Sequence, residues 1–236
     1  MRLSHSFRAS LACLTLTALA ATPVHAIGKR KDAAAEASAP VDAATQGAYA
    51  PVNYDLTQDR ENILVLDLSN GQRVQIRLMP QWAPEHVARV KALASQGFYN
   101  NVVFHRVIDG FMAQTGDPTG TGQGGSQLPD LKAEFNPQPH LRGTVSMARA
   151  ATDDSANSQF FIVFYPRFSL DRKYTVFGRV IDNMAAVDAI QRGEPPENPT
   201  RIVQASLASE NRPVPAVTQP AAPAISADDL NKPIAN

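Results

Sequence analysis

Cysteine is almost absent from this chain of 236 residues, and the single one, Cys13, lies near the amino terminus. If that terminus is removed, as argued below, the mature protein has no thiol. It then forms no disulfide, and it cannot use thiol catalysis or bind zinc through cysteine. An excess of charge is missing too, because 22 basic residues balance 22 acidic ones. No global electrostatic field attracts nucleic acid, and we expect no nucleic-acid partner.

A hydrophobic run long enough for a confident membrane span is also lacking. Residues 9–24 are apolar or small, but the stretch is short and rich in alanine, and it follows Arg2 and Arg8 with no acidic residue. Val-His-Ala, ending at Ala26, supplies the small residues that signal peptidase requires. We therefore predict a signal peptide over residues 1–26, a periplasmic location and no stable membrane anchor. The alternatives are an uncleaved anchor, and lipidation at Cys13, for which the preceding apolar stretch is too short.

Composition divides the rest of the chain into three zones. Residues 27–59 are rich in alanine and poor in large apolar side chains, which predicts a flexible leader. Residues 60–209 have the pattern of a globular domain. Residues 210–236 consist largely of proline, alanine and polar residues, which predicts an extended, disordered tail. A docking role for this tail is the alternative.

Short strands dominate the middle zone. Segments rich in apolar and β-branched residues predict strands at 63–68, 73–78, 101–108, 143–148, 158–165, 174–181 and 201–208. The first two are separated by a turn that contains Asn70 and Gly71. Because these residues adopt positive φ readily, the pair is typical of a β-hairpin.

Two segments have helical periodicity instead. Residues 83–97 begin with Pro84 in a first turn, and we expect His86 at the surface of this helix. Residues 182–193 form the second, with Asp182 as its expected N-cap. The strands and helices do not alternate regularly, which argues against a parallel sheet. This order favours a mostly β fold, with a closed antiparallel sheet and helices over its ends.

The segment Gly120–Gly125, "GTGQGG", is unlike a phosphate-binding loop. Such a loop needs a helix directly after it or a terminal Gly-Lys-Ser/Thr, whereas Pro129 follows here and lysine is missing from the segment. The glycines instead indicate a backbone that passes close to neighbouring chain or to a bound peptide.

Hydrolytic and metal chemistry have little support in the sequence. His105 and His140 are candidates for a triad, but no serine lies in a Gly-x-Ser-x-Gly turn. No two histidines have the spacing of metal ligands, so we expect neither a metal nor a cofactor.

Arg106 stands within an apolar segment, and this position has two interpretations. In a strand, Phe104, Arg106 and Ile108 point to the same side. An arginine in such surroundings is costly unless it is paired or functional. It either extends to water from the edge of the core, or it is a fixed cation beside an apolar groove.

Four segments together resemble the cyclophilin family of peptidyl-prolyl cis-trans isomerases. They are "FHRVIDGFMAQTGD" at 104–117, "SMARA" at 146–150, "NSQFFIVF" at 157–164 and "LDRKYTVFGRV" at 170–180. Their order and spacing are compatible with the family from about Asn62 to Leu207. The resemblance implies a closed eight-stranded antiparallel barrel capped by two α-helices, and isomerase activity at X-Pro bonds. With the signal peptide, it points to an exported bacterial form.

The resemblance also implies roles for individual residues. Arg106 matches the catalytic arginine, and Gln114 matches the glutamine that holds it and contacts the substrate backbone. The pocket for the proline ring is matched by Phe111, Met112, Phe161 and Leu170. Further positions of the groove are matched by His105 and Tyr174, and the strip that pairs with the peptide by Ala148 and Arg149. One departure is Ser169, where relatives that bind cyclosporin tightly often have tryptophan, so tight binding of cyclosporin is in doubt.

The expected partners are proline-containing polypeptides, either unfolded or folding after export. We expect a monomer that assists the folding of exported proteins. The alternative is a non-catalytic binding module of the same fold, a chaperone or scaffold; the arginine at position 106, which such modules can lose, argues against it.

Overall fold

The structure, a computed structural model, describes residues 55–216. The predicted signal peptide, nearly all of the predicted leader and most of the predicted tail lie outside this range. In chain order the elements are η1 (Arg60–Asn62), β1 (Ile63–Leu68), β2 (Arg73–Leu78), α2 (Pro84–Ser95), β3 (Val102–Val103), β4 (Arg106–Ile108), β5 (Met112–Thr115), β6 (Thr144–Met147), β7 (Phe160–Val163), η2 (Phe168–Leu170), β8 (Val176–Asp182), α3 (Met184–Asp188), β9 (Arg201–Leu207) and η3 (Ala208–Glu210).

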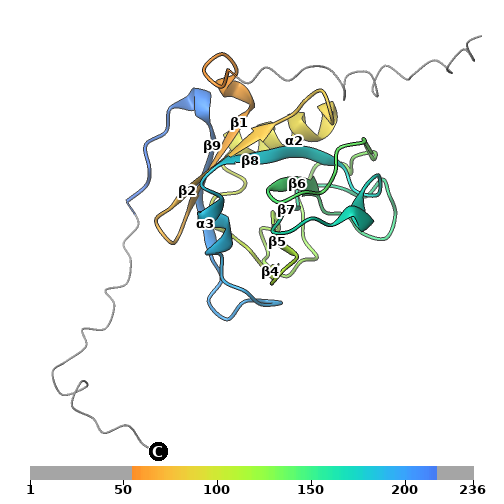
Figure 1. The fold of residues 1–236 in the computed structure, drawn as a ribbon. Coiled ribbons are helices and arrows are strands. Elements are labelled where there is room, and N and C mark those ends of the chain that lie inside the picture. The colour runs from red at the N-terminus through yellow and green to blue at the C-terminus, as the bar shows by residue number, and fades with distance from the viewer. Residues whose placement is uncertain (1–54, 217–236) are drawn as a thin grey trace, which may run out of the picture. The chain divides into compact units, whose positions relative to one another are not determined.

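A single curled antiparallel sheet forms the body of the fold (Figure 1). Its strand order is β3-β9-β1-β2-β8-β6-β7-β5-β4. Helix α2 packs against β9, and α3 packs against β2. The predicted class, a mostly β antiparallel barrel-like fold with two helices, is confirmed.

The strand count differs from the eight that the resemblance implies, and from the seven segments of the strand pattern, because the expected strand 101–108 is divided and β5 is a further strand. β3 pairs with β9, whereas β4 pairs with β5. Phe104 and His105 connect the two, and the amide of Phe104 donates to the carbonyl of Thr200 at 2.9 Å. The chain thus passes from one edge of the sheet to the other within two residues. This division and the additional strand β5 bring the sheet to nine strands.

The β1–β2 hairpin forms as predicted around its Asn-Gly turn. Gly71 has a φ of 79°, a conformation that glycine adopts without steric cost. β1 lies between β9 and β2, and all of its residues are buried. Asp67, the acidic residue among them, pairs with Arg73 across the hairpin at 2.7 Å.

Helix α2 confirms the prediction for residues 83–97, but the expected surface position of His86 is wrong. The side chain of His86 is fully buried, and its Nδ1 lies 2.6 Å from Glu134 Oε2. The same carboxylate accepts hydrogen bonds from the backbone amides of Glu85 and His86. Glu134 therefore provides a hydrogen-bond acceptor for amides of the first helical turn, which have no partner within the helix. It also provides a partner for the imidazole ring of His86 in its buried position.

Helix α3 is also present, but it covers only Met184–Asp188 of the predicted 182–193, and its N-cap is Asn183 and not Asp182. Asn183 has a φ of 58°, and its side chain accepts a hydrogen bond from the amide of Ala186. Asp182 instead ends β8, where it accepts a hydrogen bond from Gln75 at 3.0 Å. The strand continues one residue further than expected, and the cap shifts with it.

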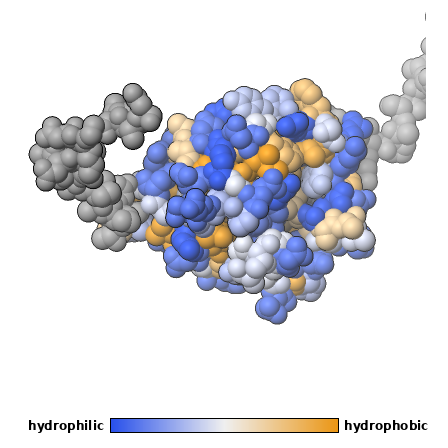
Figure 2. Space-filling view, turned by 90° about the horizontal axis from the view of Figure 1, so that it is seen from below, coloured by the Kyte–Doolittle hydropathy of each residue, from blue (hydrophilic) through white to orange (hydrophobic). Residues whose placement is uncertain are grey.

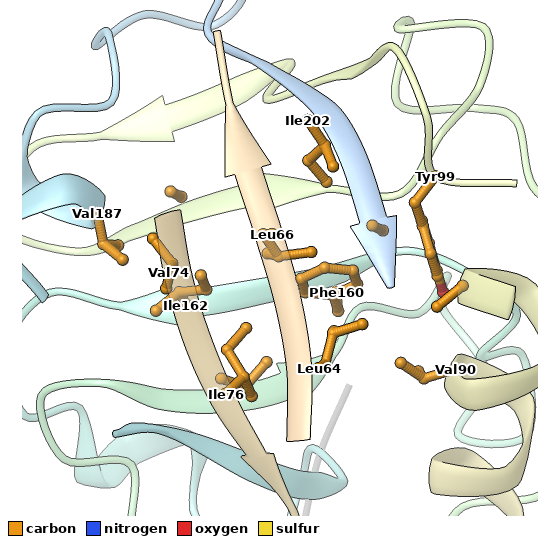
Figure 3. Close-up of a cluster of buried hydrophobic side chains, with 14 of the residues drawn as sticks. Leu64, Leu66, Val74, Ile76, Val90, Tyr99, Phe160, Ile162, Val187 and Ile202 are labelled. Carbon is orange, nitrogen blue, oxygen red and sulfur yellow. The ribbon is translucent and has the colours of Figure 1, made fainter. Parts of the chain in front are cut away.

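The core lies inside the curled sheet (Figure 3). Leucines and isoleucines of β1 and β2 meet Phe160 and Ile162 of β7 there, and Val90 of α2 and Val187 of α3 enter from the helices. The ring of Phe160 contacts the edge of Tyr99 at a centroid distance of 5.6 Å, and the Tyr99 hydroxyl donates to the carbonyl of Ser158. This cluster contains the inward-facing side chains, so the outward-facing ones are available for a surface site.

Residues at both ends of the described range contact this body. Asp59 pairs with the buried Arg77 at 2.6 Å. Beyond β9, Arg212 pairs with Glu210, and the carbonyl of Pro213 accepts a hydrogen bond from Gln204. The first residues of the predicted tail are thus in contact with the domain.

The surface is mainly hydrophilic on the face seen from below in Figure 2, where hydrophobic areas are set among polar ones. The most exposed large apolar side chains are Phe168, Tyr165 and Val214. Within residues 55–216, no helix has both the length and the apolar character needed to cross a membrane.

Candidate functional site

Alternation along β4, β5 and β7 creates a second apolar cluster on the outer face of the sheet. Val107, Ala113 and Ile162 belong to the core cluster. Their strand neighbours point to the opposite face. Met112 pairs with Val163 across β5 and β7, and both belong to the second cluster with Phe161.

A cavity of about 140 Å³ lies over this cluster. All of the predicted site residues except His105 line it: Arg106, Phe111, Met112, Gln114, Ala148, Arg149, Phe161, Leu170 and Tyr174. Phe104, which the sequence predicts on the same side as Arg106, belongs to the core cluster instead. That prediction is wrong because the strand breaks between Phe104 and Arg106.

Aromatic contacts fix the walls of the cavity. Phe161 meets Tyr174 edge-on at a centroid distance of 5.7 Å. The guanidinium of Arg149 lies 4.9 Å from the centre of the Tyr174 ring, and that of Arg167 lies 5.0 Å from the Phe111 ring. Such contacts stabilise ring positions through the quadrupole of each ring. The cavity is therefore preformed, with one apolar floor and cationic side chains around it.

Arg106 and Gln114 face each other across β4 and β5, but their side chains have different partners. Arg106 Nε donates to Glu194 Oε2 at 2.8 Å. Gln114 Nε2 donates to Gln159 Oε1 at 2.9 Å. Glu194, and not Gln114, thus holds the arginine here. Sequence reasoning missed Glu194, since nothing in "RGEPPENP" distinguishes one of its two acids from the other.

His105 lies apart from the cavity. Its ring is almost completely buried, and it packs beneath the glycine loop, where a Cβ on Gly122 would lie 3.4 Å from His105 Cδ2. Burial lowers the pKa of His105, with the charge of Asp117 acting in the opposite direction. A groove role for this residue stays a prediction.

A larger and more polar cavity, of about 460 Å³, adjoins the apolar one. The two share Gln114, Ala148 and Arg149 as lining residues. The far side of the larger cavity is formed by the glycine loop and by residues 155–159. Together the two cavities make a groove, with a small part over the apolar cluster and a larger, more polar part beside the glycine loop.

The carboxylate of Asp117 organises the glycine loop, and sequence reasoning missed this residue. It accepts hydrogen bonds from the amides of Thr119, Gly122 and Gly124 at 2.8, 2.6 and 3.1 Å. A Cβ on Gly124 would lie 2.2 Å from Asp117 Oδ1. The sequence offers two explanations for the glycines, close approach to neighbouring chain or to a bound peptide. The contact of Gly124 with Asp117 supports the first.

The hydrogen bonds to Asp117 change the pKa of its carboxyl group. Burial alone would raise the pKa of Asp117, but the hydrogen bonds from Thr119, Gly124 and Gly122 outweigh it and lower the pKa to about 2. Hydrogen bonds that favour the charged form have this effect. The loop thus closes around a carboxylate that stays ionised.

Behind Phe161 lies a chain of three polar groups. His140 stacks on the Phe161 ring at a centroid distance of 6.2 Å. Its Nδ1 lies 2.8 Å from Asp171 Oδ1, and its Nε2 lies 2.8 Å from Ser146 Oγ. The order is that of a hydrolytic triad, yet Ser146 and His140 have no exposed surface. A substrate cannot reach the hydroxyl, so the group supports Phe161 from behind and is no hydrolytic site.

His140 predicts acid sensitivity of the fold. Burial lowers the pKa of His140, and Asp171 only partly offsets this. The unfolded chain therefore binds a proton more readily, near pH 6.5. The stabilising contribution is complete above that pH and is lost as the pH falls below it, by at most about 1.4 kcal/mol per pH unit for one histidine. Urea unfolding between pH 8 and pH 5 would measure this loss.

The matched variant for this experiment is His140→Asn, which removes the titrating group. It is expected to be less stable than the wild type at pH 8 but to lose less stability between pH 6.5 and 5. Equal slopes in the two proteins would contradict the assignment.

Within residues 55–216, no cluster of three or more histidine, aspartate, glutamate or cysteine side chains is arranged to hold a metal ion.

Comparisons with known proteins agree on one family. The family model described as "Cyclophilin type peptidyl-prolyl cis-trans isomerase/CLD" matches residues 63–207. A "Probable peptidyl-prolyl cis-trans isomerase" of Brucella suis is 45% identical over 170 residues, which cover 65% of this chain and 86% of the relative. "Peptidyl-prolyl cis-trans isomerase B" of Bacillus subtilis is 41% identical over 128 residues, which cover 54% of this chain and 89% of the relative.

Solved structures give the same result. A cyclophilin from Hirschia baltica has a TM-score of 0.60 and 29% identity, covering 66% of this chain and 77% of its own. A cyclophilin type isomerase of Cryptosporidium parvum, crystallised in the presence of the dipeptide Ala-Pro, has a TM-score of 0.57 and 28% identity. That match covers 61% of this chain and 98% of its own.

Proposed function

The chain belongs to the cyclophilin-type peptidyl-prolyl cis-trans isomerases, and we propose that it assists the folding of exported proteins in the periplasm by isomerising their X-Pro bonds. The isomerase activity is that of the family. The periplasmic location and the exported substrate proteins are our proposal, and both depend on the predicted signal peptide over residues 1–26. A mature chain without cysteine also suits an oxidising compartment, because it has no thiol to oxidise.

The reaction itself needs no covalent step. Amide resonance gives rotation about the peptide bond a barrier of about 18–20 kcal/mol, and uncatalysed X-Pro isomerisation takes on the order of tens to hundreds of seconds. An enzyme only has to bind the twisted amide more tightly than either planar form.

One observation carries the assignment of the site: a guanidinium lies beside a small apolar cavity. In our proposal the cavity over Met112 and Phe161 holds the proline ring against its apolar floor. Arg106 then donates to the proline nitrogen. This nitrogen gains a lone pair only when resonance is broken, so the interaction favours the transition state over the ground state.

The adjoining polar cavity extends the groove for the rest of the peptide. The glycine loop, Gln159 and Asn157 line it, and the two side-chain amides are held by carbonyls of Gly124 and Leu128. In our proposal this wall accommodates an extended main chain without reading its sequence. The Ala-Pro dipeptide used with the Cryptosporidium relative supports a peptide of this kind as the ligand. We therefore expect broad acceptance of proline-containing polypeptides.

Export and activity are tested together in a Gram-negative host that expresses the full chain with a carboxy-terminal tag. We expect X-Pro isomerase activity above background in the periplasmic fraction, and a mature amino terminus at Ile27. The measurements are a protease-coupled assay on the fraction and mass determination of the purified protein.

A variant that lacks residues 2–26 is the control, and it should remain in the cytoplasm with its activity intact. A mature protein that keeps residues 1–26, or activity confined to the cytoplasm with the full chain, would refute the periplasmic role. Peptide binding without any acceleration would favour the non-catalytic binding module instead.

A further inference from the structure

The loop between α3 and β9, residues 189–200, places an acidic side chain against the arginine of the site. Glu194 Oε2 accepts the hydrogen bond from Arg106 Nε at 2.8 Å. Glu194 is separated from Arg106 by 88 positions in the chain, and it is not among the residues that line the apolar cavity. Its contact is therefore with the arginine and not with the space where a proline ring would lie.

Backbone pairing fixes the position of this carboxylate. Gly193, directly before Glu194, forms a two-way bridge with Val107, directly after Arg106. The amide of Val107 donates to the carbonyl of Gly193 at 2.8 Å, and the amide of Gly193 donates back at 2.9 Å. Gly193 has a φ of 145°, and a Cβ there would lie 2.5 Å from Pro196 Cα. Only glycine fits at position 193, and this residue keeps the loop paired with β4.

The contact leaves the rest of the guanidinium available. Among residues 55–216, neither Nη atom of Arg106 has a hydrogen-bond partner, and Gln114 is engaged with Gln159. Because a guanidinium is planar and rigid, a bond at Nε determines where its other donors point. A free arginine side chain would distribute over many rotamers, at an ordering cost of about 1.5–2 kcal/mol.

We propose that Glu194 is a positioning residue of the isomerase: its carboxylate holds Arg106 by Nε so that the Nη donors are presented to a proline bound in the apolar cavity. This inference rests on the proposed function of Arg106. It assigns to the 189–200 loop a part in the reaction, and to Glu194 the holding role that the resemblance implies for Gln114.

The carboxylate of Glu194 also has an opposing effect, because its negative charge weakens the positive field of Arg106. The side chains of Arg106 and Glu194 are 42% and 50% exposed. Water and salt screen charges that are this accessible, and exposed ion pairs contribute only about 0.2–1 kcal/mol. The directional hydrogen bond is less affected by this screening, so orientation outweighs the loss of field.

Three variants of the full mature chain separate the two effects. Glu194→Ala removes the acceptor and should lower kcat by about three- to tenfold with little change in KM. Glu194→Gln keeps an acceptor oxygen without the charge and should retain at least about half of the activity. Glu197→Ala removes the same charge from the same loop, but Glu197 has no partner within residues 55–216, and its activity should match the wild type.

The Nε–H resonance of Arg106 in a nitrogen–proton NMR spectrum gives an independent readout. It should shift in Glu194→Ala and stay in place in Glu197→Ala. The proposal is overturned if Glu194→Ala is as active as the wild type or more active. It is equally overturned if Glu194→Ala and Glu197→Ala lose activity to the same extent. An inactive wild type, by contrast, would refute the proposed function itself.

Discussion

Replacement of Arg106 by alanine is expected to lower kcat/KM for an Ala-Pro peptide by about two to three orders of magnitude, the usual cost of removing a donor aimed at transition-state charge. The reason is geometric. Arg106 lines the cavity over Met112, and within residues 55–216 its Nη atoms have no hydrogen-bond partner that would compete with a bound proline. A protease-coupled or NMR exchange assay measures the change.

Peptide affinity should change much less than the rate in this variant. The planar substrate has no lone pair on the proline nitrogen, so the lost hydrogen bond belongs to the twisted state alone. NMR titration with the same peptide would measure binding directly. A parallel loss of affinity and rate would mean that Arg106 only binds the ground state.

Two controls make the result specific to the guanidinium at this position. Arg106→Lys keeps the charge but loses the rigid fork, so it should recover only a small part of the rate. Arg201→Ala removes an exposed arginine from β9 and should leave the rate unchanged. If Arg106→Ala is as fast as the wild type, the assignment of the site is wrong.

Replacement of Asp117 by asparagine is expected to destabilise the fold by about 3 kcal/mol, since several hydrogen bonds to a charged acceptor are lost at once. Asp117 is fully buried. An asparagine amide would direct its own N–H groups at donors such as the amide of Gly122, which now lies 2.6 Å from the carboxylate. Urea unfolding at pH 7 measures the difference, and Asp109→Asn, at an exposed carboxylate, is the matched control.

The pH dependence of the same two proteins checks the cause. The pKa of Asp117 is lowered to about 2, below its unfolded value near 3.9. Its stabilising contribution is therefore complete above pH 4 and is lost as the pH falls toward 2. Asp117→Asn should lack this part of the acid transition. Equal stability of the variant and the wild type at pH 7 would show that the carboxylate is dispensable.

Local signals in the sequence are enough to predict the elements whose structure depends on near neighbours. The Asn-Gly turn specifies the first hairpin, and the apolar spacing after Pro84 specifies α2. The resemblance assigns the residues of the site, and the structure brings all of them except His105 together around one cavity. Alternation alone would have placed Phe104 among them, because nothing local marks the point where the strand leaves β9 for β5.

The features that were missed depend on distant parts of the chain. His86 is buried through Glu134, which is 48 positions away, and Arg106 is held by Glu194, which is 88 positions away. A carboxylate in a polar segment has the same local pattern whether it faces solvent or a guanidinium. Asp117 differs, since its partners are within seven residues. The density of glycine after it was the available signal.

The two outermost strands have a consequence for the proposed work on unfolded chains. β3 has two residues and β4 has three, and only two residues separate them in the chain. Unpaired main-chain N–H and C=O groups on an edge strand can pair with a strand of another chain, and such pairing can begin aggregation. Edge strands of two and three residues offer few such groups for pairing. In the proposed role, the protein would thus bind incompletely folded chains through its groove, with little main-chain pairing between its sheet and theirs.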